Sequence, residues 1–383
     1  MRFEFASAAQ IIFGPGTLGE AVSAARSAGS RVLLVTGRTG ERAGPLREHL
    51  RASGLAVEQF RVTGEPSLAA VREGVERARQ AGSDVVVAIG GGSVLDAGKA
   101  IAALRTNPGD VLDYLEVIGA GKPLERPALP WIAVPTTAGT GAEVTRNAVL
   151  FCPEHRVKAS LRSRFLLPRL AVVDPELTLE LPPAITAATG LDALTQLIEP
   201  FVSLRANPLT DGFCREGIPR AAGSLVRAFH DGHDAEARAN MALASLLSGL
   251  ALANAGLGAV HGFAAAIGGM FPAPHGAVCA ALLAPVMEAN LKALRARQPD
   301  HPALARYDEV ARLLTGGAAR ADEGIAWVRR VTSELAIPGL RAYGVEESHY
   351  AEIVARAARA SSMRGNPLPL TEDELIAVLH AAR

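Results

Sequence analysis

Three residues whose side chains can ligate a metal stand in apolar surroundings in the second half of the chain. Asp192 lies in an Ala/Leu-rich segment, and His261 and His275 lie in a largely apolar, glycine-rich stretch. Burying one carboxylate and two imidazoles costs free energy unless these groups bind something. Together they predict a divalent-metal site with open positions for a substrate. Gln196 follows Asp192 by four residues, so on a helix both side chains lie on the same face.

A run of glycines, Gly90-Gly91-Gly92, is followed by Ser93 between a strand-like apolar segment and a helix-like segment. Consecutive glycines let the backbone approach a bulky anion, and a helix N-terminus adds free N–H groups and the positive end of a dipole. This arrangement predicts a cradle for a diphosphate. The alternative is an ordinary tight turn from strand to helix, because a single glycine motif is weak evidence.

A second polar loop, residues 135–145, follows another apolar strand-like segment and holds four threonines and two glycines. Loops at the carboxyl ends of parallel strands face one crevice. Both loops are therefore predicted to converge on one ligand, a dinucleotide. The alternative is a solvated loop in which the threonines only form turns.

The elements that must position these loops alternate between strand and helix patterns in the first half of the chain. Continuous apolar runs closed by glycine, proline or aspartate are typical of parallel strands covered on both faces. The pattern predicts a doubly wound α/β domain that binds its ligand beyond the carboxyl ends of the strands. Strands are predicted at 11–13, 31–36, 84–89, 131–134 and 170–173, and helices at 69–81 and 95–104.

After Pro182-Pro183 the pattern changes to long Ala/Leu-rich segments with helical periodicity. Proline tolerates the start of a helix but not its interior, so this pair marks a hinge. We predict an α/β dinucleotide-binding domain over 1–181 and an all-helical metal-binding domain over 182–383. Helices are predicted at 184–201, 211–229, 235–254, 276–293, 302–314, 321–335, 347–359 and 372–382.

The composition excludes several classes of protein. With 49% hydrophobic and 20% charged residues the chain is not mainly disordered. The 39 basic side chains are matched by 39 acidic ones, which argues against nucleic acid or a membrane surface as partner, because both attract clustered positive charge. No membrane span or signal peptide is predicted, so we expect a cytoplasmic protein.

The three cysteines, Cys152, Cys214 and Cys279, are far apart in the sequence. An odd and sparse set predicts neither a disulfide framework nor a CxxC metal site. We interpret all three as small buried hydrophobic residues, the usual role of a free cysteine.

Taken in combination, these motifs are specific, and the chain resembles the iron-containing (group III) alcohol dehydrogenase family over nearly its whole length. That family shares its fold with glycerol dehydrogenase and dehydroquinate synthase. The resemblance implies NAD(P) in the N-terminal domain and one divalent metal, iron or zinc, in the helical domain. The motifs that carry it are GGGS at 90–93, PTTAGTGAEVT at 135–145, ATGLDAL at 188–194, and the histidines of VHG and PHG at 261 and 275.

The resemblance also implies roles for single residues. Asp192, His261 and His275 match three metal ligands of the family. Lys158 resembles the lysine that contacts the cofactor ribose. The implied cofactor-binding residues are Gly91, Gly92, Ser93, Thr136, Thr137, Thr140, Val149, Lys158 and Leu177.

Two positions depart from the family pattern. Gln196 stands where the iron enzymes usually have a histidine ligand, so either its amide oxygen binds the metal or the site uses three ligands and water. Ala265 stands where many members have a histidine that helps to move a proton, and alanine cannot do so. The proton would then pass through water or cofactor hydroxyls.

The implied activity is metal-dependent hydride transfer between NAD(P) and a small alcohol, aldehyde or ketone, in a homodimer or higher homo-oligomer. The metal would polarise the carbonyl oxygen or stabilise the alkoxide. A lyase of the dehydroquinate-synthase type is a weaker alternative, because segments 188–198 and 260–276 contain no Lys or Arg to hold a phosphate. A catalytically inactive homologue that binds metal or nucleotide is the third possibility.

The choice between NAD and NADP depends on the residue after the strand at 31–36. An acidic side chain near such a strand end commonly bonds the ribose 2′-hydroxyl of NAD. Here the residue is Gly37, which leaves room for a 2′-phosphate, and Arg38 and Arg42 follow. We therefore expect NADP to bind at least as well as NAD, unless Gly37 is only a turn residue.

Overall fold

The computed structural model describes residues 2–383, which divide into two compact units. An α/β unit comprises Ala6–Thr137 and Gly141–Leu179. A helical unit comprises Glu180–Arg383 together with residues 2–5 and the short segment Ala138–Thr140. Part of the threonine-rich loop thus makes most of its contacts with the helical unit rather than with the sheet that precedes it.

The α/β unit is built on a six-stranded sheet in which every pair of neighbouring strands is parallel. The continuous apolar runs of the sequence are its central strands, and both of their faces are buried. Across the sheet the strands are β1 (Ile11–Phe13), β8 (Leu170–Val173), β5 (Trp131–Pro135), β4 (Val85–Gly90), β2 (Arg31–Thr36) and β3 (Ala56–Arg61).

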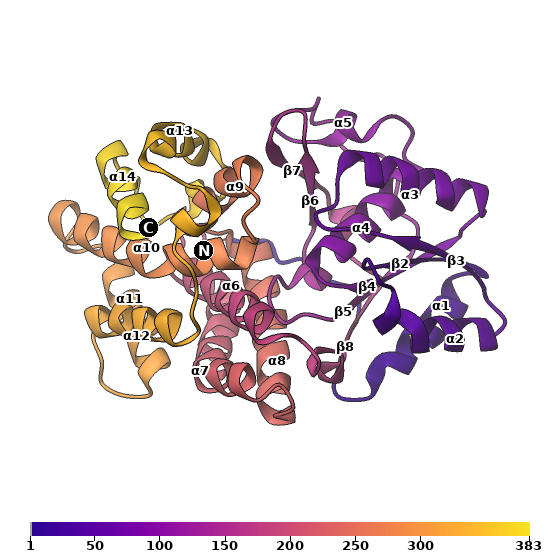
Figure 1. Cartoon of the computed structure of the whole chain (residues 1–383), viewed down its shortest axis with the longest axis horizontal. Helices are drawn as coiled ribbons and strands as arrows, with labels where there is room; N and C mark the ends of the chain where they lie inside the picture. The colour runs from indigo at the N-terminus through magenta and orange to yellow at the C-terminus, as the bar shows by residue number, and fades with distance from the viewer. Residues whose placement is uncertain (1) are drawn as a thin grey trace. The chain divides into compact units, whose positions relative to one another are not determined.

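Side chains of successive strand residues enter different cores, as the two-residue period of a strand requires. Leu33 packs into the core on one face of the sheet, and Leu34 packs into the core on the other. Figure 1 shows α3 (Leu68–Gln80) and α4 (Gly92–Thr106) on one side of the sheet. On the other side lie α1 (Glu20–Ala28) and α2 (Gly44–Ala52).

The strand order reverses between β2 and β4. From β2 the chain moves outward to β3, and it then returns to the other side of β2 and continues through β4, β5 and β8. Thr36 pairs with Ile89, so both strands end at the same level of the sheet. The carboxyl edge at such a reversal is where doubly wound sheets bind ligands.

The helical unit contains no strand among its described residues. Within it, α6, α7 and α8 pack against one another, and α10 packs against α6 and α9. Its helices are α6 (Pro183–Val202), α7 (Pro208–His230), α8 (Ala235–Ala255), α9 (Ala259–Met270), α10 (His275–Arg297), α11 (Ala303–Thr315), α12 (Ala321–Glu334), α13 (Tyr350–Arg359) and α14 (Glu372–Ala381).

Short elements complete the chain. An antiparallel hairpin of β6 (Asn147–Cys152) and β7 (Val157–Arg162) lies beside the sheet, and α5 (Val111–Tyr114) is a single turn. The 3₁₀ helices are Thr17–Gly19, Glu41–Ala43, Ala142–Val144, Arg164–Leu166, Pro175–Thr178, Leu340–Tyr343, Glu347–His349 and Ser361–Gly365.

The fold class and all the predicted strands are confirmed, and some further elements were not predicted. Strand β3 is an edge strand and β7 pairs only with β6, so both carry polar residues, whereas β6 is apolar from Ala148 to Cys152 and was not predicted. Helix α9 contains three glycines, which weaken its helical pattern. The helix predicted over 347–359 begins at Tyr350, after a 3₁₀ turn.

Helix α10 has the length and apolarity of a membrane span, and α8 with α9 would also qualify if the pair were not bent by 98°. However, 72% of the most apolar window of α10 is buried within the fold. This burial is the pattern of the core helix of a globular unit.

Candidate metal centre and cofactor loops

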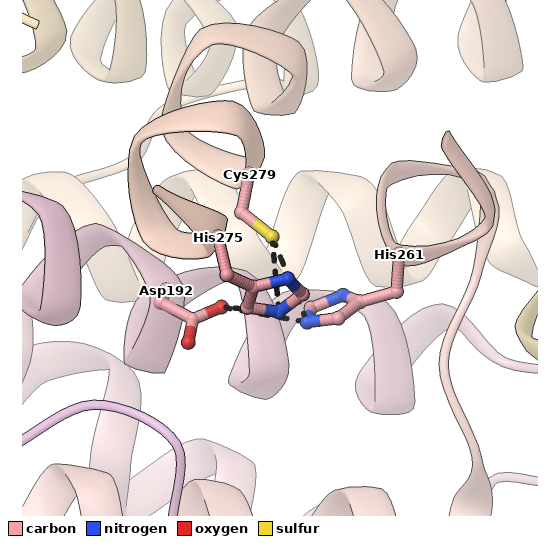
Figure 2. Close-up of side chains that lie close together, drawn as sticks. All are labelled: Asp192, His261, His275 and Cys279. Atoms are coloured by element: carbon pink, nitrogen blue, oxygen red, sulfur yellow. Dashed lines mark hydrogen bonds and ion pairs between the residues drawn. The ribbon is translucent and has the colours of Figure 1, made fainter. Parts of the chain in front are cut away.

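Four side chains bring metal-ligating atoms together inside the helical unit. Asp192 comes from α6, His261 from α9, and His275 and Cys279 from α10, and one donor atom of each lies within 4.8 Å of all the others. Figure 2 shows the four side chains converging on one another from these helices. The sequence predicted three of the four, and the structure adds Cys279.

The separations of the donor atoms are close to those found around a metal. Oδ1 of Asp192 lies 3.4 Å from Nε2 of His261 and 3.7 Å from Nε2 of His275. Sγ of Cys279 lies 3.8 Å and 3.7 Å from the same two nitrogens. Asp192, His261 and Cys279 are buried, and His275 is partly exposed.

The start of α10 is held against α6 by a close backbone contact. A Cβ atom on Gly276 would lie 2.4 Å from the carbonyl oxygen of Ala188, so only glycine permits this approach. The contact places His275, the first residue of α10, beside Asp192 of α6. Cys279 follows one helical turn later and therefore lies on the same face as His275.

Glu199 sets the orientation of the His261 ring. Its Oε2 lies 2.7 Å from Nδ1 of His261, and its Oε1 accepts a hydrogen bond of 2.7 Å from the backbone N–H of Val260. Because Nδ1 is engaged by the carboxylate, Nε2 is the nitrogen that faces the donor group. Sequence reasoning missed Glu199, although it stands seven residues after Asp192 and so on the same face of α6.

The chemistry of this donor set fits a divalent cation. Oδ1 of Asp192 is buried and makes no hydrogen bond, which is costly for a carboxylate that has no other partner. Burial alone would raise the pKa of Asp192, but His275, His261 and Gln196 stabilise its charged form and lower the pKa to about 2. A carboxylate oxygen, two imidazole nitrogens and a sulfur suit zinc or iron(II).

Burial acts in opposite directions on the pKa values of the other two buried donors, Cys279 and His261. It raises the pKa of the Cys279 thiol to about 12, so the free side chain is protonated at neutral pH. Burial would lower the pKa of His261, but the nearby Cys279 and Glu199 raise it well above its ordinary value.

Gln196 lies beside the donor group but turns its amide nitrogen toward its neighbours. Nε2 donates to the carbonyl oxygen of Gly139 at 3.4 Å, and the side chain stabilises the charged form of Asp192. Oε1 lies 3.5 Å from Oγ of Ser248, whose hydroxyl donates to the carbonyl oxygen of Ser245 at 2.8 Å. The amide thus supports the carboxylate of Asp192 with an N–H group, which cannot ligate a metal.

In the α/β unit, the glycine loop has the form of an anion cradle. Gly91 is the N-cap of α4 and offers no side-chain acceptor, so the first N–H groups of this 15-residue helix, at Gly92 and Ser93, remain for a ligand. A Cβ on Gly90 would lie 2.6 Å from Val94. Glycine therefore also permits the tight turn from β4 into α4.

The threonine loop begins directly beside the glycine loop. The N–H of Thr136 donates to the carbonyl oxygen of Gly90 at 2.9 Å. A Cβ on Gly91 would lie 3.3 Å from the methyl group of Thr137. Gly37 follows β2 at the same edge, where an added Cβ would lie 3.9 Å from Val94. The structure thus brings these predicted residues to one edge of the sheet.

The remaining predicted cofactor residues are more dispersed. Val149 and Lys158 lie on the β6–β7 hairpin, where the ammonium of Lys158 pairs with Glu65 at 2.9 Å. Leu177 packs into the core on the α1 and α2 side of the sheet. Thr140 belongs to the helical unit.

Lys99, a buried residue of α4 that the sequence did not single out, connects this helix to the threonine loop and to β6. Nζ of Lys99 bonds Oδ1 of Asp96 at 3.2 Å, Oγ1 of Thr145 at 2.7 Å and the carbonyl oxygen of Asn147 at 2.9 Å. The other carboxylate oxygen of Asp96 accepts from the N–H of Val149 at 2.9 Å. Helix α4 is thereby tied to the end of the threonine loop and to β6.

Comparison with known families agrees with this geometry. The profile described as "Iron-containing alcohol dehydrogenase" matches residues 8–175, and the profile of the C-terminal part of that family matches residues 186–383. The chain belongs to the iron-containing alcohol dehydrogenase family. Membership makes it a metal-dependent oxidoreductase that acts on CH–OH groups with NAD(P), as the motifs predicted.

Individual members of the family are similar over their whole length. Alcohol dehydrogenase 4 of Saccharomyces cerevisiae (strain YJM789) is 36% identical, over 97% of this chain and 96% of that protein. A crystal structure of 1,3-propanediol oxidoreductase has a TM-score of 0.92 and 34% identity, with 100% of both chains covered. A sulfoacetaldehyde reductase from Bifidobacterium kashiwanohense in complex with NAD⁺ has a TM-score of 0.87 and 30% identity, over 100% of this chain and 99% of that one.

Proposed function

We propose that this alcohol dehydrogenase interconverts a small polar alcohol and its aldehyde or ketone, using iron(II) or zinc, and accepts NADP at least as well as NAD. The observation that carries the metal assignment is the donor set of Asp192, His261 and His275, of which the first two are buried. Within it, Oδ1 of Asp192 makes no hydrogen bond. A cation would supply the missing partner of this oxygen.

Each residue of the site has a distinct task in this proposal. Asp192, His261 and His275 would hold the ion, and Glu199 keeps the His261 ring in its orientation. When bound, the ion polarises the carbonyl oxygen of the substrate and the nicotinamide carries the hydride. Gln196 hydrogen-bonds Asp192 and keeps its carboxylate in place.

The cofactor is assigned to the carboxyl edge of the parallel sheet. The N–H groups at the start of α4 bind the diphosphate, because they are unpaired within the helix and lie at its positive end. The threonine loop contacts the nicotinamide end, and the β6–β7 hairpin contributes to the ribose site. The residues assigned to the cofactor are Gly37, Gly91, Gly92, Ser93, Thr136, Thr137, Thr140, Val149, Lys158 and Leu177.

The preference for NADP rests on the end of β2. Gly37 has no carboxylate to repel a 2′-phosphate, and Arg38 is exposed beside it. Thr36 pairs with Arg61 at the end of β3, and Arg61 is also exposed. An exposed arginine thus follows the glycine and another stands at the adjacent strand end, and charge-assisted bonds to phosphate are among the stronger hydrogen bonds.

The proton of the alcohol has no side-chain relay at position 265. Ala265 offers no group that can carry a proton. We therefore assign proton transfer to water or to hydroxyl groups of the cofactor.

The small polar substrate class follows from composition and from the relatives. Aromatic residues make up only 4% of the chain, so large apolar pockets are costly to build. Two similar structures are named for 1,3-propanediol and sulfoacetaldehyde, both small polar molecules. The homodimeric or larger assembly and the cytoplasmic location belong to the same proposal.

The test is metal-dependent oxidation of NADH and NADPH with a panel of short aldehydes and ketones. The protein is stripped with a chelator and reloaded anaerobically with Fe²⁺ or Zn²⁺. Activity that vanishes on stripping and returns with one equivalent of metal supports the proposal. No activity with any aldehyde or ketone, together with no bound metal, would favour the inactive homologue instead. Sedimentation of the same sample gives the oligomeric state.

A further inference from the structure

We propose that Sγ of Cys279 is a fourth ligand of the metal and that Gln196 is a positioning residue outside the ligand set. The proposal rests on the proposed function in one respect only, the assignment of a metal to Asp192, His261 and His275. It replaces the two alternatives left by the sequence, a glutamine oxygen or a water molecule as the fourth ligand.

The sulfur of Cys279 lies close to both imidazole rings of the donor group. Sγ of Cys279 lies 3.8 Å from Nε2 of His261 and 3.7 Å from Nε2 of His275. Metal–ligand bonds of about 2.0–2.3 Å at tetrahedral angles separate neighbouring ligand atoms by about 3.3–3.6 Å. The sulfur stands within about 0.2 Å of this range from both imidazoles, and so does Oδ1 of Asp192, at 3.4 Å and 3.7 Å.

Neither the sulfur of Cys279 nor Oδ1 of Asp192 has a close hydrogen-bond partner among the described residues. Cys279 is fully buried, and among residues 2–383 its hydrogen-bond contacts are the long ones to the two imidazole nitrogens. Oδ1 of Asp192 is buried without a hydrogen bond. Two donor atoms face the same pair of nitrogens, and neither has a close hydrogen-bond partner. This arrangement indicates a cation that lies among the four atoms.

The amide of Gln196 is oriented with its nitrogen toward acceptor groups. Its nitrogen donates to the carbonyl oxygen of Gly139, and the side chain stabilises the charged form of Asp192. Its oxygen lies 3.5 Å from Oγ of Ser248, whose hydroxyl donates to the carbonyl oxygen of Ser245 at 2.8 Å. Turning the amide over would place its oxygen against the carbonyl oxygen of Gly139, and neither oxygen can donate to the other. The network therefore favours an amide that supports Asp192 through its N–H₂ group.

Binding of a metal ion by Cys279 would release one proton. The thiol of Cys279 gives its proton to solvent as the sulfur–metal bond forms. The carboxylate of Asp192 and the thiolate then neutralise a divalent ion, which lowers the cost of burying it. A thiolate is a softer donor than an imidazole or an amide, so this site favours zinc or iron(II) over magnesium or manganese.

The test uses cobalt(II), because a thiolate bound to Co²⁺ gives an intense near-ultraviolet charge-transfer band that oxygen and nitrogen ligands do not give. The unmodified protein, stripped of metal, is titrated with Co²⁺. A band that rises to saturation at one equivalent supports the proposal. One equivalent of bound Co²⁺ without the band overturns it and leaves the proposed function standing. If no Co²⁺ binds, both fail.

Two cysteine variants identify the sulfur. Cys279→Ser should remove the band and weaken Co²⁺ binding at least tenfold. Cys214→Ser is the matched control, since Cys214 is equally buried but lies in α7 outside the donor group, and it should keep both. Cys279→Ala is the second variant if the serine protein does not fold. A band that persists in a folded Cys279 variant overturns the assignment.

A third variant separates the two candidates for the fourth ligand. Gln196→Leu should keep the charge-transfer band, because the sulfur remains bound, and should weaken Co²⁺ binding less than Cys279→Ser does. If Gln196→Leu instead abolishes binding while Cys279→Ser leaves it unchanged, glutamine is the ligand and the proposal is wrong. Circular dichroism of each stripped variant confirms that the fold is retained.

Discussion

Nδ1 of His261 lies 2.7 Å from Oε2 of Glu199, and this buried carboxylate also accepts the N–H of Val260 at 2.7 Å. One side chain of α6 therefore fixes both the start of α9 and the direction of the imidazole on it. A carboxylate behind a metal-binding histidine is a recurrent arrangement, because it holds the ring and increases its basicity.

Replacing Glu199 by Gln should weaken metal binding by about 10–100-fold. The single amide oxygen of the glutamine can replace only one of the two carboxylate oxygens as a hydrogen-bond acceptor. The ring of His261 therefore loses its charged partner. The affinity is measured by competition with a chromophoric chelator. Glu216→Gln, on the exposed face of α7, is the control and should not change it. Equal affinities in both variants would show that Glu199 does not position the ring.

Replacing His275 by Ala should empty the metal site and abolish turnover, because one of the two imidazole donors is removed from a buried charged cluster. Metal content per chain is measured by mass spectrometry after gel filtration. His233→Ala, at an exposed position, should retain full metal. Full occupancy in the His275 variant would remove this residue from the ligand set.

Replacing Gly37 by Asp should shift the cofactor preference toward NAD by about tenfold or more, roughly 1.4 kcal/mol. The new carboxylate would repel the 2′-phosphate of NADP and accept a hydrogen bond from the 2′-hydroxyl of NAD. The ratio of kcat/KM with NADPH to that with NADH is measured for both proteins. A wild type that strongly favours NADH, with no change in the variant, would contradict this interpretation of the β2 end.

Replacing Glu143 by Gln should change the pH dependence of stability. Burial raises the pKa of Glu143 from its ordinary 4.5 to about 7. Between these values the folded state holds a proton that the unfolded state releases, so this group lowers the free energy of unfolding as pH rises. The total loss is roughly 3 kcal/mol.

Glutamine cannot ionise, so its contribution to stability should not fall in this way as the pH rises. The free energy of unfolding of the Glu143 variant, relative to that of the wild type, should therefore be higher at pH 8 than at pH 5. Denaturant unfolding of both proteins at the two pH values measures this difference. The same difference at pH 5 and pH 8 would mean that Glu143 does not titrate in this range.

Replacing Gly276 by Ala should destabilise the helical unit by about 1–3 kcal/mol and lower its metal occupancy. The added Cβ would lie 2.4 Å from the carbonyl oxygen of Ala188, so the start of α10 must move away from α6. Gly223→Ala in α7 is the control, because a Cβ there meets nothing within 4 Å. That change should stabilise its helix by up to about 1 kcal/mol. Thermal melts and metal analysis compare the two variants.

Much of the scaffold could be predicted from local sequence signals. Buried parallel strands such as β4 are apolar along their whole length, and the glycines that follow permit the turn into α4. Asp192, His261 and His275 could be selected because charged or polar donors are conspicuous in apolar segments. The family resemblance followed from the same motifs and is confirmed.

Other features depended on contacts between distant segments. Helix α9 is rich in glycine and is held by packing rather than by propensity. Cys279 looks like a core residue in sequence, because nothing local distinguishes a buried thiol in a hydrophobic core from one beside two imidazoles. Its spacing of four residues from His275 was the available signal, and it gained meaning only when α9 brought His261 to the same place.

The sequence by itself determined which residues could do chemistry and which elements would carry them, since both follow from side-chain type and periodicity. The tertiary structure decided which donors meet. Glu199 became the partner of His261, Gln196 turned its N–H₂ toward Asp192, and Cys279 joined the donor group. These relationships depend on how α6, α9 and α10 pack, and close packing is specified by many side chains together rather than by any single motif.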